Sequence, residues 1–542
     1  MPNWLKNFSK NKKRNVKKGK DISGQTTVSI SEDEIGTNLD ENIKKIIKAT
    51  GNSSDIVIRK MHVNDSIHFA VLYTDGLVDN NTINDFLLEG LLHDNGIFYP
   101  VSAEHALHLI KDKMIAIGGI TSIYRWDDLF QSLFSGATII LIDQANEALS
   151  VSTVGGEKRQ ISEPGTETTI RGPREGFTET LRTNTALIRR RIKNPNLWLE
   201  TIKIGKETQT DVAIMYINGI ANDNIIKEIR KRLQRIDIDG ILESGYIEQL
   251  IEDQTFTSFP TLYHTERPDV VAANILEGRI AILVDGTPFI LTAPALFVEF
   301  FQAADDYYSR FDISSGIRLL RVLAFFISLT APSIYIAATT FHQEMIPTLL
   351  LITIAAQRET VPFPAFVEAV IMEVIFEILR EAGVRLPKAI GQTVSIVGAL
   401  VIGQAAVQAG IVSPAMVIIV SITAIANFST PSFSMAIAAR LIRFLFMILA
   451  ATFGFYGLIM GVLVMLIHLC SLRSFGVPYM SPLAPFIKNN VDDTITRMPI
   501  WAFKERPRLI SQKNIVRSGK NQKPQPPKQH TKQQNNQNGE SE

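Results

Sequence analysis

Hydrophobic and polar residues are distributed unevenly along this chain, and the pattern changes near residue 310. A run of about 20 apolar residues is long enough to cross the roughly 30 Å hydrocarbon core of a lipid bilayer. Several long apolar runs follow one another after the change, at residues 318–340, 389–411, 413–428 and 437–470. The pattern therefore predicts an integral membrane protein with an all-α polytopic membrane domain at residues 311–488.

The same pattern limits the number of membrane crossings without fixing it. Residues 345–356 are apolar but too short to span the bilayer, which suits a re-entrant or interfacial segment, and residues 363–381 are amphipathic. Residues 437–470 can form one long tilted helix or a hairpin. We expect four full crossings, within a range of four to six.

Before residue 310 the pattern predicts a soluble α/β region made of two small mixed α/β subdomains. The first, at residues 55–160, has strand-like runs at DIVIRKM, IHFAVLYTDGLV and GATIILID and helical spacing at NDFLLEGLL and SAEHALHLIKDKM. The second, at residues 161–310, contains a linker, a basic helix at 176–193, and alternating strands and helices that suggest a small mixed sheet. No internal repeat is apparent.

Both ends of the chain are polar. Residues 1–54 predict a disordered basic arm without the apolar core of a cleavable signal peptide, and residues 489–542 predict a cytosolic basic region and a disordered tail. Arg318 and Arg321 precede the first apolar run, and five Lys or Arg residues follow the last within residues 504–517. Because basic flanks stay on the cytoplasmic side, we expect both termini to be cytoplasmic and the number of crossings to be even.

Composition and motifs argue against catalysis. The net charge is +1, and the single cysteine, Cys470, excludes an intramolecular disulfide and any multi-cysteine metal site. The histidines are scattered, and no P-loop, HExxH or GxSxG motif is present. The sequence therefore predicts neither an enzyme nor a cofactor or metal site.

The basic helix around Arg182 and residues 189–191 raises the question of nucleic acid. No aromatic residues interleave with its charges and nearby glutamates dilute them, so we expect no nucleic-acid partner. A solvated or subunit-facing surface fits better, and contact with anionic lipid headgroups is the alternative.

Residues 389–411 combine many Gly and Ala residues with three glutamines. One face of this helix carries Val397, Val401, Gln404 and Gln408 at three- and four-residue spacing. These residues can line a pore, with the valines as a hydrophobic gate and the glutamines as wetted rings. The alternative is close helix packing, in which the glutamines bond across the bundle.

Glu373, Glu377 and Glu381 lie four residues apart and predict one acidic stripe on a helix. Around an oligomer axis, this stripe would form acidic rings that concentrate cations near a pore mouth. The alternative is an interfacial helix whose acids face water and pair partly with Arg380 and Arg385.

Several separated blocks resemble one family. The stretch GPREGFTETLRTNTALIRRRI at 172–192 is similar to the signature of the spore germinant receptor A subunits of the GerA, GerB and GerK type. Further blocks are REAGVRLPKAIGQTVSIVGALVIGQAAVQAGIVSP at 380–414, SLRSFGVPYMSPLAPF at 471–486, VDGTPFILTAP at 284–294 and ADDYYSRF at 304–311. The resemblance spans residues 55–505, and the long polar ends look most like the K type. The signature positions taken as a structural contact are Pro173, Arg174, Glu175, Gly176, Phe177, Arg182 and Asn184.

This resemblance implies a subunit of a nutrient receptor in the spore inner membrane that triggers germination. Family members work with a transporter-like B subunit and a lipoprotein C subunit, and they are thought to form a ring, a pentamer, that acts as a ligand-gated cation channel. Two other readings stay open. One is an A-like accessory protein of the spore dipicolinate channel locus, and the other is a stand-alone transporter, against which the lack of inverted repeats argues.

Overall fold

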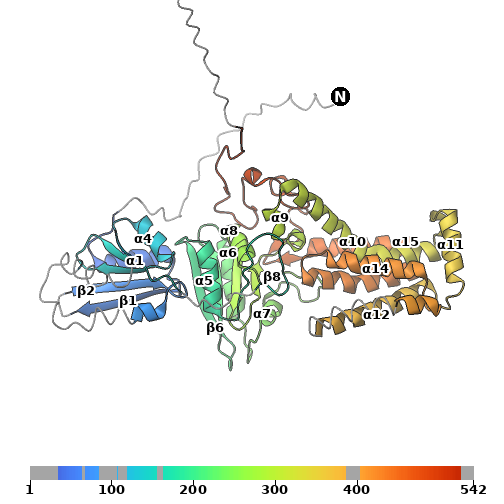
Figure 1. Cartoon of the computed structure of the whole chain (residues 1–542), viewed down its shortest axis with the longest axis horizontal. Helices are drawn as coiled ribbons and strands as arrows, with labels where there is room; N and C mark the ends of the chain where they lie inside the picture. The colour runs from blue at the N-terminus through green and yellow to red at the C-terminus, as the bar shows by residue number, and fades with distance from the viewer. Residues whose placement is uncertain are drawn as a thin grey trace, which may run out of the picture.

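The computed structural model describes residues 34–63, 67–84, 107, 119–155, 163–385 and 403–526. Three parts follow one another along its long axis (Figure 1): a first unit (residues 34–155), a second unit (163–303) and a helical region (305–471). The first two parts are β-sheets covered by helices. This arrangement confirms the predicted α/β region followed by an all-α region.

The first unit is a five-stranded antiparallel sheet with the strand order β1-β2-β4-β5-β3. Alternate residues of its strands face opposite sides, so that Ala70 and Leu72 pack with the helices while Phe69 and Val71 enter a second core. Its elements are α1 (Leu39–Thr50), β1 (Ile56–Val63), β2 (Ile67–Thr74), β3 (Ile120–Ile123), α4 (Trp126–Leu133), β4 (Thr138–Ile142) and β5 (Ala148–Val151). The two helices predicted within residues 84–114 lie almost entirely outside the described residues.

The second unit is also a five-stranded sheet, with the order β6-β7-β9-β10-β8. One face packs against α5 and α8, and the other against α6 and α7. Its elements are α5 (Leu181–Arg191), β6 (Leu197–Ile204), β7 (Thr210–Ile217), α6 (Asp223–Gln234), α7 (Ser244–Ile251), β8 (Tyr263–Thr265), α8 (Pro268–Leu276), β9 (Ile280–Val284) and β10 (Ile290–Ala293). All described strand pairs are antiparallel, so the expectation of a mixed sheet was wrong.

The two units are copies of one fold, which corrects the expectation that the chain has no internal repeat. Numbered within each unit, the strands follow the same order, and in each unit a helix precedes the first strand and another precedes the fourth. Two aspartates hold equivalent positions. The Asp143 carboxylate accepts a hydrogen bond from the N–H of Leu39 (3.0 Å), and Asp285 accepts one from Leu181 (2.9 Å). Each aspartate thereby caps the helix that precedes its sheet.

Helix α1 corrects the predicted extent of the disordered arm. The Asn38 side chain caps this helix, which ends at Gly51 in the left-handed conformation (φ 63°). Leu39, Ile43 and Ile46 pack into the core of the first unit. Their i, i+4, i+7 spacing gives a buried helical face, even though the surrounding composition is polar.

The helical region contains η5 (Phe297–Phe301), α9 (Asp305–Tyr308), α10 (Phe311–Thr340), η6 (Gln343–Met345), α11 (Thr348–Arg358), α12 (Ala365–Arg385), α14 (Pro414–Phe428) and α15 (Phe433–Ser471). By length and composition, α10 and the 39-residue α15, which is divided at Gly454, are apolar and long enough to cross a membrane. Helices α11 and α14 are shorter apolar helices. The expected number of four to six crossings stays a prediction.

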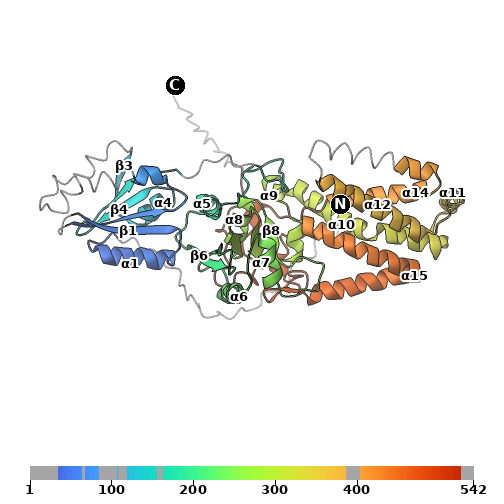
Figure 2. The ribbon, with the colours of Figure 1, turned by 90° about the horizontal axis from the view of Figure 1, so that it is seen from below.

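Helix α15 is two helices that turn back on each other at Gly454, which selects the hairpin over one long helix (Figure 2). The backbone of Gly454 is non-helical (φ 61°, ψ −142°). The Cα of Gly461 lies close to Phe446, since a Cβ built on this glycine would be 3.2 Å from the Phe446 ring. Residues 433–453 and 455–471 therefore lie side by side.

The chain leaves the helical region where it entered. After α15, β11 (Arg473–Ser474) and β12 (Val477–Pro478) form a short hairpin, and η7 (Lys488–Asn490) and η8 (Ile500–Ala502) follow. Phe475 and Val477 pack into the core of the second unit. The hydroxyl of Ser474 accepts a hydrogen bond from the N–H of Ala295 at 3.0 Å, so the entering and leaving segments are joined directly.

We expect Gly454→Ala to destabilise the helical region by about 1–3 kcal/mol, because a side chain is strained at this φ and its Cβ would lie 2.8 Å from His342. The melting temperature of the detergent-solubilised protein measures this loss. Gly316→Ala is the matched control, since its added Cβ meets nothing within 4 Å. Equal melting temperatures for both variants would contradict a turn at Gly454.

Candidate functional site

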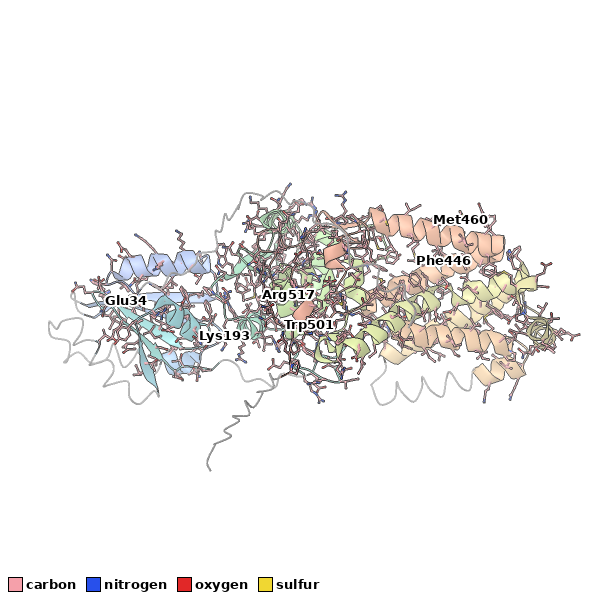
Figure 3. All side chains as sticks on the ribbon, turned by 90° about the horizontal axis from the view of Figure 1, so that it is seen from above. Glu34, Lys193, Phe446, Met460, Trp501 and Arg517 are labelled. Atoms are coloured by element: carbon pink, nitrogen blue, oxygen red, sulfur yellow. The ribbon has the colours of Figure 1, made fainter. Side chains whose placement is uncertain are left out.

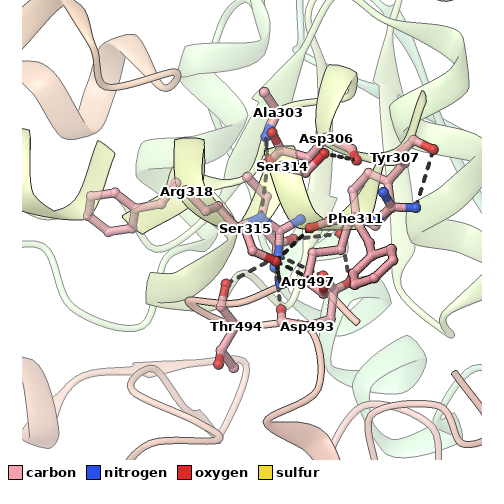
Figure 4. Close-up of polar contacts among 12 residues, drawn as sticks. Ala303, Asp306, Tyr307, Phe311, Ser314, Ser315, Arg318, Asp493, Thr494 and Arg497 are labelled. Carbon is pink, nitrogen blue, oxygen red and sulfur yellow. Dashed lines mark hydrogen bonds and ion pairs between the residues drawn. The ribbon is translucent and has the colours of Figure 1, made fainter. Parts of the chain in front are cut away.

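The candidate site is a buried cluster of charged residues where the second unit meets the helical region. We call it the junction; it comprises Asp306, Tyr307, Ser315, Arg318, Arg321, Asp493 and Arg497, and Figure 4 labels all of these residues except Arg321. Its members come from α9, from the first turns of α10 and from the segment after η7. Three arginines face two aspartates, which leaves the junction with an excess of one positive charge.

Arg318 lies at the centre of the junction, and none of its side chain is exposed. Its Nε donates to Asp306 (2.9 Å), and its Nη1 donates to Asp493 (2.6 Å) and to the backbone oxygen of Thr494 (3.2 Å). Arg321, one turn further along α10, also donates to Asp306 (2.8 Å). One aspartate thus binds two arginines of the first long apolar helix.

Tyr307 and Arg497 attach the C-terminal segment more firmly. The Tyr307 hydroxyl donates to Asp493 at 2.7 Å, and its ring lies beneath the guanidinium groups of Arg318 and Arg497 (5.4 and 5.5 Å to the centroid). Burial, together with the Asp493 carboxylate, raises the pKa of Tyr307, so its hydroxyl stays protonated. Ser315 accepts a hydrogen bond from the N–H of Arg497 at 3.0 Å.

A second buried arginine, Arg267, holds the linker that precedes α5. Its guanidinium donates to the backbone oxygens of Glu167 (3.3 Å) and Pro173 (3.1 Å) and to the carboxylate of Asp269 (2.7 Å). Tyr308 of α9 donates to the same carboxylate. The linker, α8 and α9 are therefore tied together next to the junction.

The signature positions contact other parts of the chain. Arg174 pairs with Glu163 (3.0 Å), Glu175 with Arg191 (2.6 Å) and Arg182 with Asp75 of the first unit (3.4 Å). Phe177 is buried in the core of the second unit, and Asn184 bonds both the N–H and the C=O of Thr178. The Pro173 oxygen accepts from Arg267 as above, and Gly176 lies in the same segment.

The basic helix α5 connects the two units. Arg189 is fully buried and forms a bidentate pair with Asp55 of the first unit, with N···O distances of 2.7 and 3.0 Å. Arg190 donates to the oxygen of Gly155 at 3.2 Å. Residues 189–191 were the arginines considered for contact with lipid headgroups. Arg189 cannot make this contact, because no part of its side chain is exposed.

The predicted acidic stripe lies on α12 and is divided by its partners. Glu373 is buried inside the helical region and pairs with Arg443 (2.6 Å). Glu377 pairs with Arg380 and with Arg440 (3.3 Å), and Glu381 pairs with Arg385 (2.7 Å) and is largely exposed. The pairs with Arg380 and Arg385 are those expected for an interfacial helix. An acidic ring formed by Glu377 and Glu381 around an oligomer axis stays a prediction.

The predicted pore face lies partly outside the described residues. Val397 and Val401 fall in the segment that the structure does not describe. Gln404 and Gln408 follow it, in a helical stretch at residues 403–408, and both are exposed. Among the residues that the structure describes, neither glutamine bonds to an acidic residue of α12.

Sequence reasoning missed the junction, apart from Arg318 and Arg321, which it used only as basic flanks. Arg318 and Asp493 are 175 residues apart, and no local pattern pairs residues at such a distance. The signal available was indirect: two acidic residues and two tyrosines at 305–308 lie ten to thirteen residues before Arg318, at the start of the apolar run.

Comparison with known proteins identifies the class. The family described as Bacillus/Clostridium GerA spore germination protein matches residues 41–509. Spore germination protein KA of Bacillus subtilis (strain 168) is 62% identical over 494 residues, 91% of this chain and 90% of that protein. Spore germination protein B1 of the same strain is 42% identical over 88% of this chain and 97% of its own length.

This chain belongs to the GerA family of spore germination proteins, which confirms the resemblance drawn from its sequence. The higher identity to the KA protein agrees with the K type. A solved structure of the N-terminal domain of the A subunit of the Bacillus megaterium spore germinant receptor GerK3 matches with 52% identity, covering 49% of this chain and 98% of that one, at a TM-score of 0.41.

We expect Arg318→Met to destabilise the protein by about 3–5 kcal/mol, because it leaves the buried carboxylate of Asp306 with one cation fewer. The melting temperature of the full-length protein in detergent is the measurement. Arg310→Met is the control, since Arg310 is 76% exposed and pairs only at the surface with Asp312. Equal melting temperatures of the two variants would contradict a stabilising role for the junction.

Burial raises the pKa of Glu167 from 4.5 to about 7, although Thr265 donates to it and Arg267 lies nearby. The folded protein therefore holds a proton that the unfolded chain releases above about pH 4.5, and this stability is lost as the pH rises to 7. We expect the melting temperature of Glu167→Gln to fall less than that of the wild type between pH 4.5 and 7. Glu207→Gln, at an exposed position, should keep the wild-type slope. If the melting temperatures of the wild type and of both variants changed equally with pH, the raised pKa of Glu167 would be refuted.

Proposed function

We propose that this chain is the A subunit of a nutrient germinant receptor in the spore inner membrane and that several copies form a cation-conducting ring. A transporter-like B subunit would bind the nutrient, and a lipoprotein C subunit would complete the receptor. The family membership supports the receptor role. The pentameric ring and both partner subunits come from the family resemblance.

The observation that supports an oligomer best is the exposure of Gln404 and Gln408 next to apolar helices. An amide side chain that faces lipid leaves its donors and acceptors without partners, which is costly in hydrocarbon. A neighbouring copy or a water-filled pore would satisfy both glutamines. The face that continues toward Val401 and Val397 is then a conduction path, with the valines as its narrow apolar part.

Charge placement supports cation passage. The buried Arg443–Glu373 pair neutralises the interior of the helical region, whereas Glu381 retains 59% exposure at the end of α12. A ring of such carboxylates would attract cations electrostatically. The junction would transmit receptor binding, because α9, α10 and the C-terminal segment share its ion pairs.

The membrane arrangement follows the same proposal. The start of helix α10 and the end of helix α15 both lie next to the second unit. A multi-pass domain with both soluble ends on the cytoplasmic face agrees with this placement and with the basic flanks.

Val397→Ala widens the proposed apolar constriction, so spores with this variant should release potassium without nutrient. Potassium in the medium of dormant spores is the measurement. Ile425→Ala is the control, because Ile425 is 68% exposed on α14 and the change removes similar apolar volume outside the proposed pore. Normal potassium retention by Val397→Ala spores that contain the protein would refute the gate.

A further inference from the structure

The segment that follows α7, residues 254–258, carries a phenylalanine that is almost fully exposed. The side chain of Phe256 keeps 93% of its exposure. Single exposed apolar residues are common on protein surfaces, so exposure alone carries no conclusion. Phe256 is distinguished by its position, because residues on both sides of it are bonded to the end of the α15 hairpin or to the turn that follows it.

Three contacts hold this segment at the last turn of α15. The hydroxyl of Thr257 lies 3.0 Å from Nε2 of His468, and the ring of Phe259 packs against the same imidazole, with 6.2 Å between the ring centroids. On the other side, the Asp253 carboxylate accepts a hydrogen bond of 3.0 Å from the N–H of Gly476, between β11 and β12. The phenylalanine between these contacts therefore lies at the level of the end of α15.

The end of α15 marks the place where the apolar surface of the helical region stops. The second arm of α15 runs along the outer edge of this region, where Figure 3 labels Met460. Val464 and Ile467 of this arm are exposed, and polar residues follow at Ser471 and Arg473. Because this arm crosses the bilayer in the arrangement proposed above, its last turn and the segment bonded to it lie at the depth of the lipid headgroups.

The residues around Phe256 suit that depth. Aromatic and other large apolar side chains at a membrane surface bury themselves at the boundary between headgroups and acyl chains. The neighbours of this ring within residues 254–258 are Gln, Thr and Ser, which can bond to headgroups and water. Arg473 is exposed and forms no ion pair with any residue that the structure describes, so its charge is available to lipid phosphates.

The acidic residues beside the segment do little to oppose contact with these phosphates. Asp253 pairs with Arg232, which balances its charge. Burial raises the pKa of Glu252, and burial together with Glu252 and Glu243 raises the pKa of Glu248 to about 7. A larger fraction of both carboxyl groups is therefore neutral than at an exposed position.

Helix α7, which leads into the segment, adds apolar side chains on its outer face. Ile247 and Ile251 pack into the core of the second unit, whereas Tyr246 and Leu250, four residues apart, are exposed. In Figure 1, α7 lies at the lower side of the second unit and α9, which leads into α10, at the upper side. A bilayer contact after α7 would thus support this unit on the side opposite the junction.

We propose that residues 254–258 form a membrane contact of the second unit, with the ring of Phe256 inserted in the headgroup region of the bilayer. The junction and this contact together fix the tilt of the second unit relative to the helices. A movement that lifts this side of the unit must withdraw the ring into water. The inference rests on the membrane arrangement proposed above and is independent of the pore.

The test measures which reagents reach a nitroxide label at position 256 of the full-length protein in nanodiscs of phosphatidylglycerol and phosphatidylethanolamine. Cys470→Ser removes the single cysteine, and Phe256→Cys, Ile467→Cys or Ile170→Cys then provides one labelling site. Ile467, 69% exposed on α15, is the lipid reference, and Ile170, 94% exposed in the linker before α5, is the water reference. Oxygen concentrates in lipid, whereas a neutral nickel chelate stays in water.

We expect the ratio of oxygen to nickel access at Phe256→Cys to be several-fold higher than at Ile170→Cys and close to that at Ile467→Cys. A ratio like that of Ile170→Cys would overturn the proposal. Low access of both reagents would mean that protein covers the ring, which overturns it as well. Nickel access at Ile467→Cys would instead refute the membrane arrangement, and this inference with it.

A second measurement needs no attached label. Phe256→Trp adds an indole at the proposed contact, and its fluorescence is obtained by subtracting that of the wild type. Bromine on the lipid acyl chains quenches only indoles close to them, so we expect most of the added fluorescence to be lost in brominated nanodiscs. Ile170→Trp is the matched control and should keep its added fluorescence. Equal added fluorescence of Phe256→Trp in ordinary and brominated lipid would contradict insertion.

Discussion

Arg318 is fully buried near the start of the first long apolar helix, where it pairs with Asp306, 12 residues before it, and with Asp493, 175 residues after it. A guanidinium in such a place cannot lose one partner without leaving an uncompensated charge in a poorly solvated environment. Helix α10 therefore cannot rotate or slide independently of α9 and of the segment around Asp493. Any movement that passes between the two sheet units and the helical region must move these three elements together or exchange their ion pairs.

Periodicity predicted most of the local structure. The strand-like runs became β1, β2 and β4, the basic helix became α5, and the long apolar runs became α10 and α15. The first apolar helix begins at Phe311 rather than at residue 318, because polar residues with serines bonded to the preceding turn continue the helix. Helix α1 was missed because its core leucine, Leu39, and its two core isoleucines, Ile43 and Ile46, are diluted by lysine and asparagine.

Long-range relations could not be predicted in this way. The likeness of the two units lies in their geometry, as in the equivalent caps from Asp143 and Asp285. The hairpin at Gly454 depends on a single backbone conformation inside an unbroken apolar run. Glu373 pairs with Arg443, 70 residues away, and Arg318 pairs with Asp493, 175 residues away, and only the folded chain brings these residues together.

The core of the second unit has a consequence for biosynthesis. Phe475, Val477 and Ile510 belong to the same buried cluster as Ile214 and Ile282. A ribosome makes the strands of this sheet first and must then make every apolar helix before these last core side chains emerge. The face of the sheet that these side chains cover must wait, partly uncovered, until the apolar helices have been made. The rate of translation thus determines how long this face is open to aggregation or to chaperones.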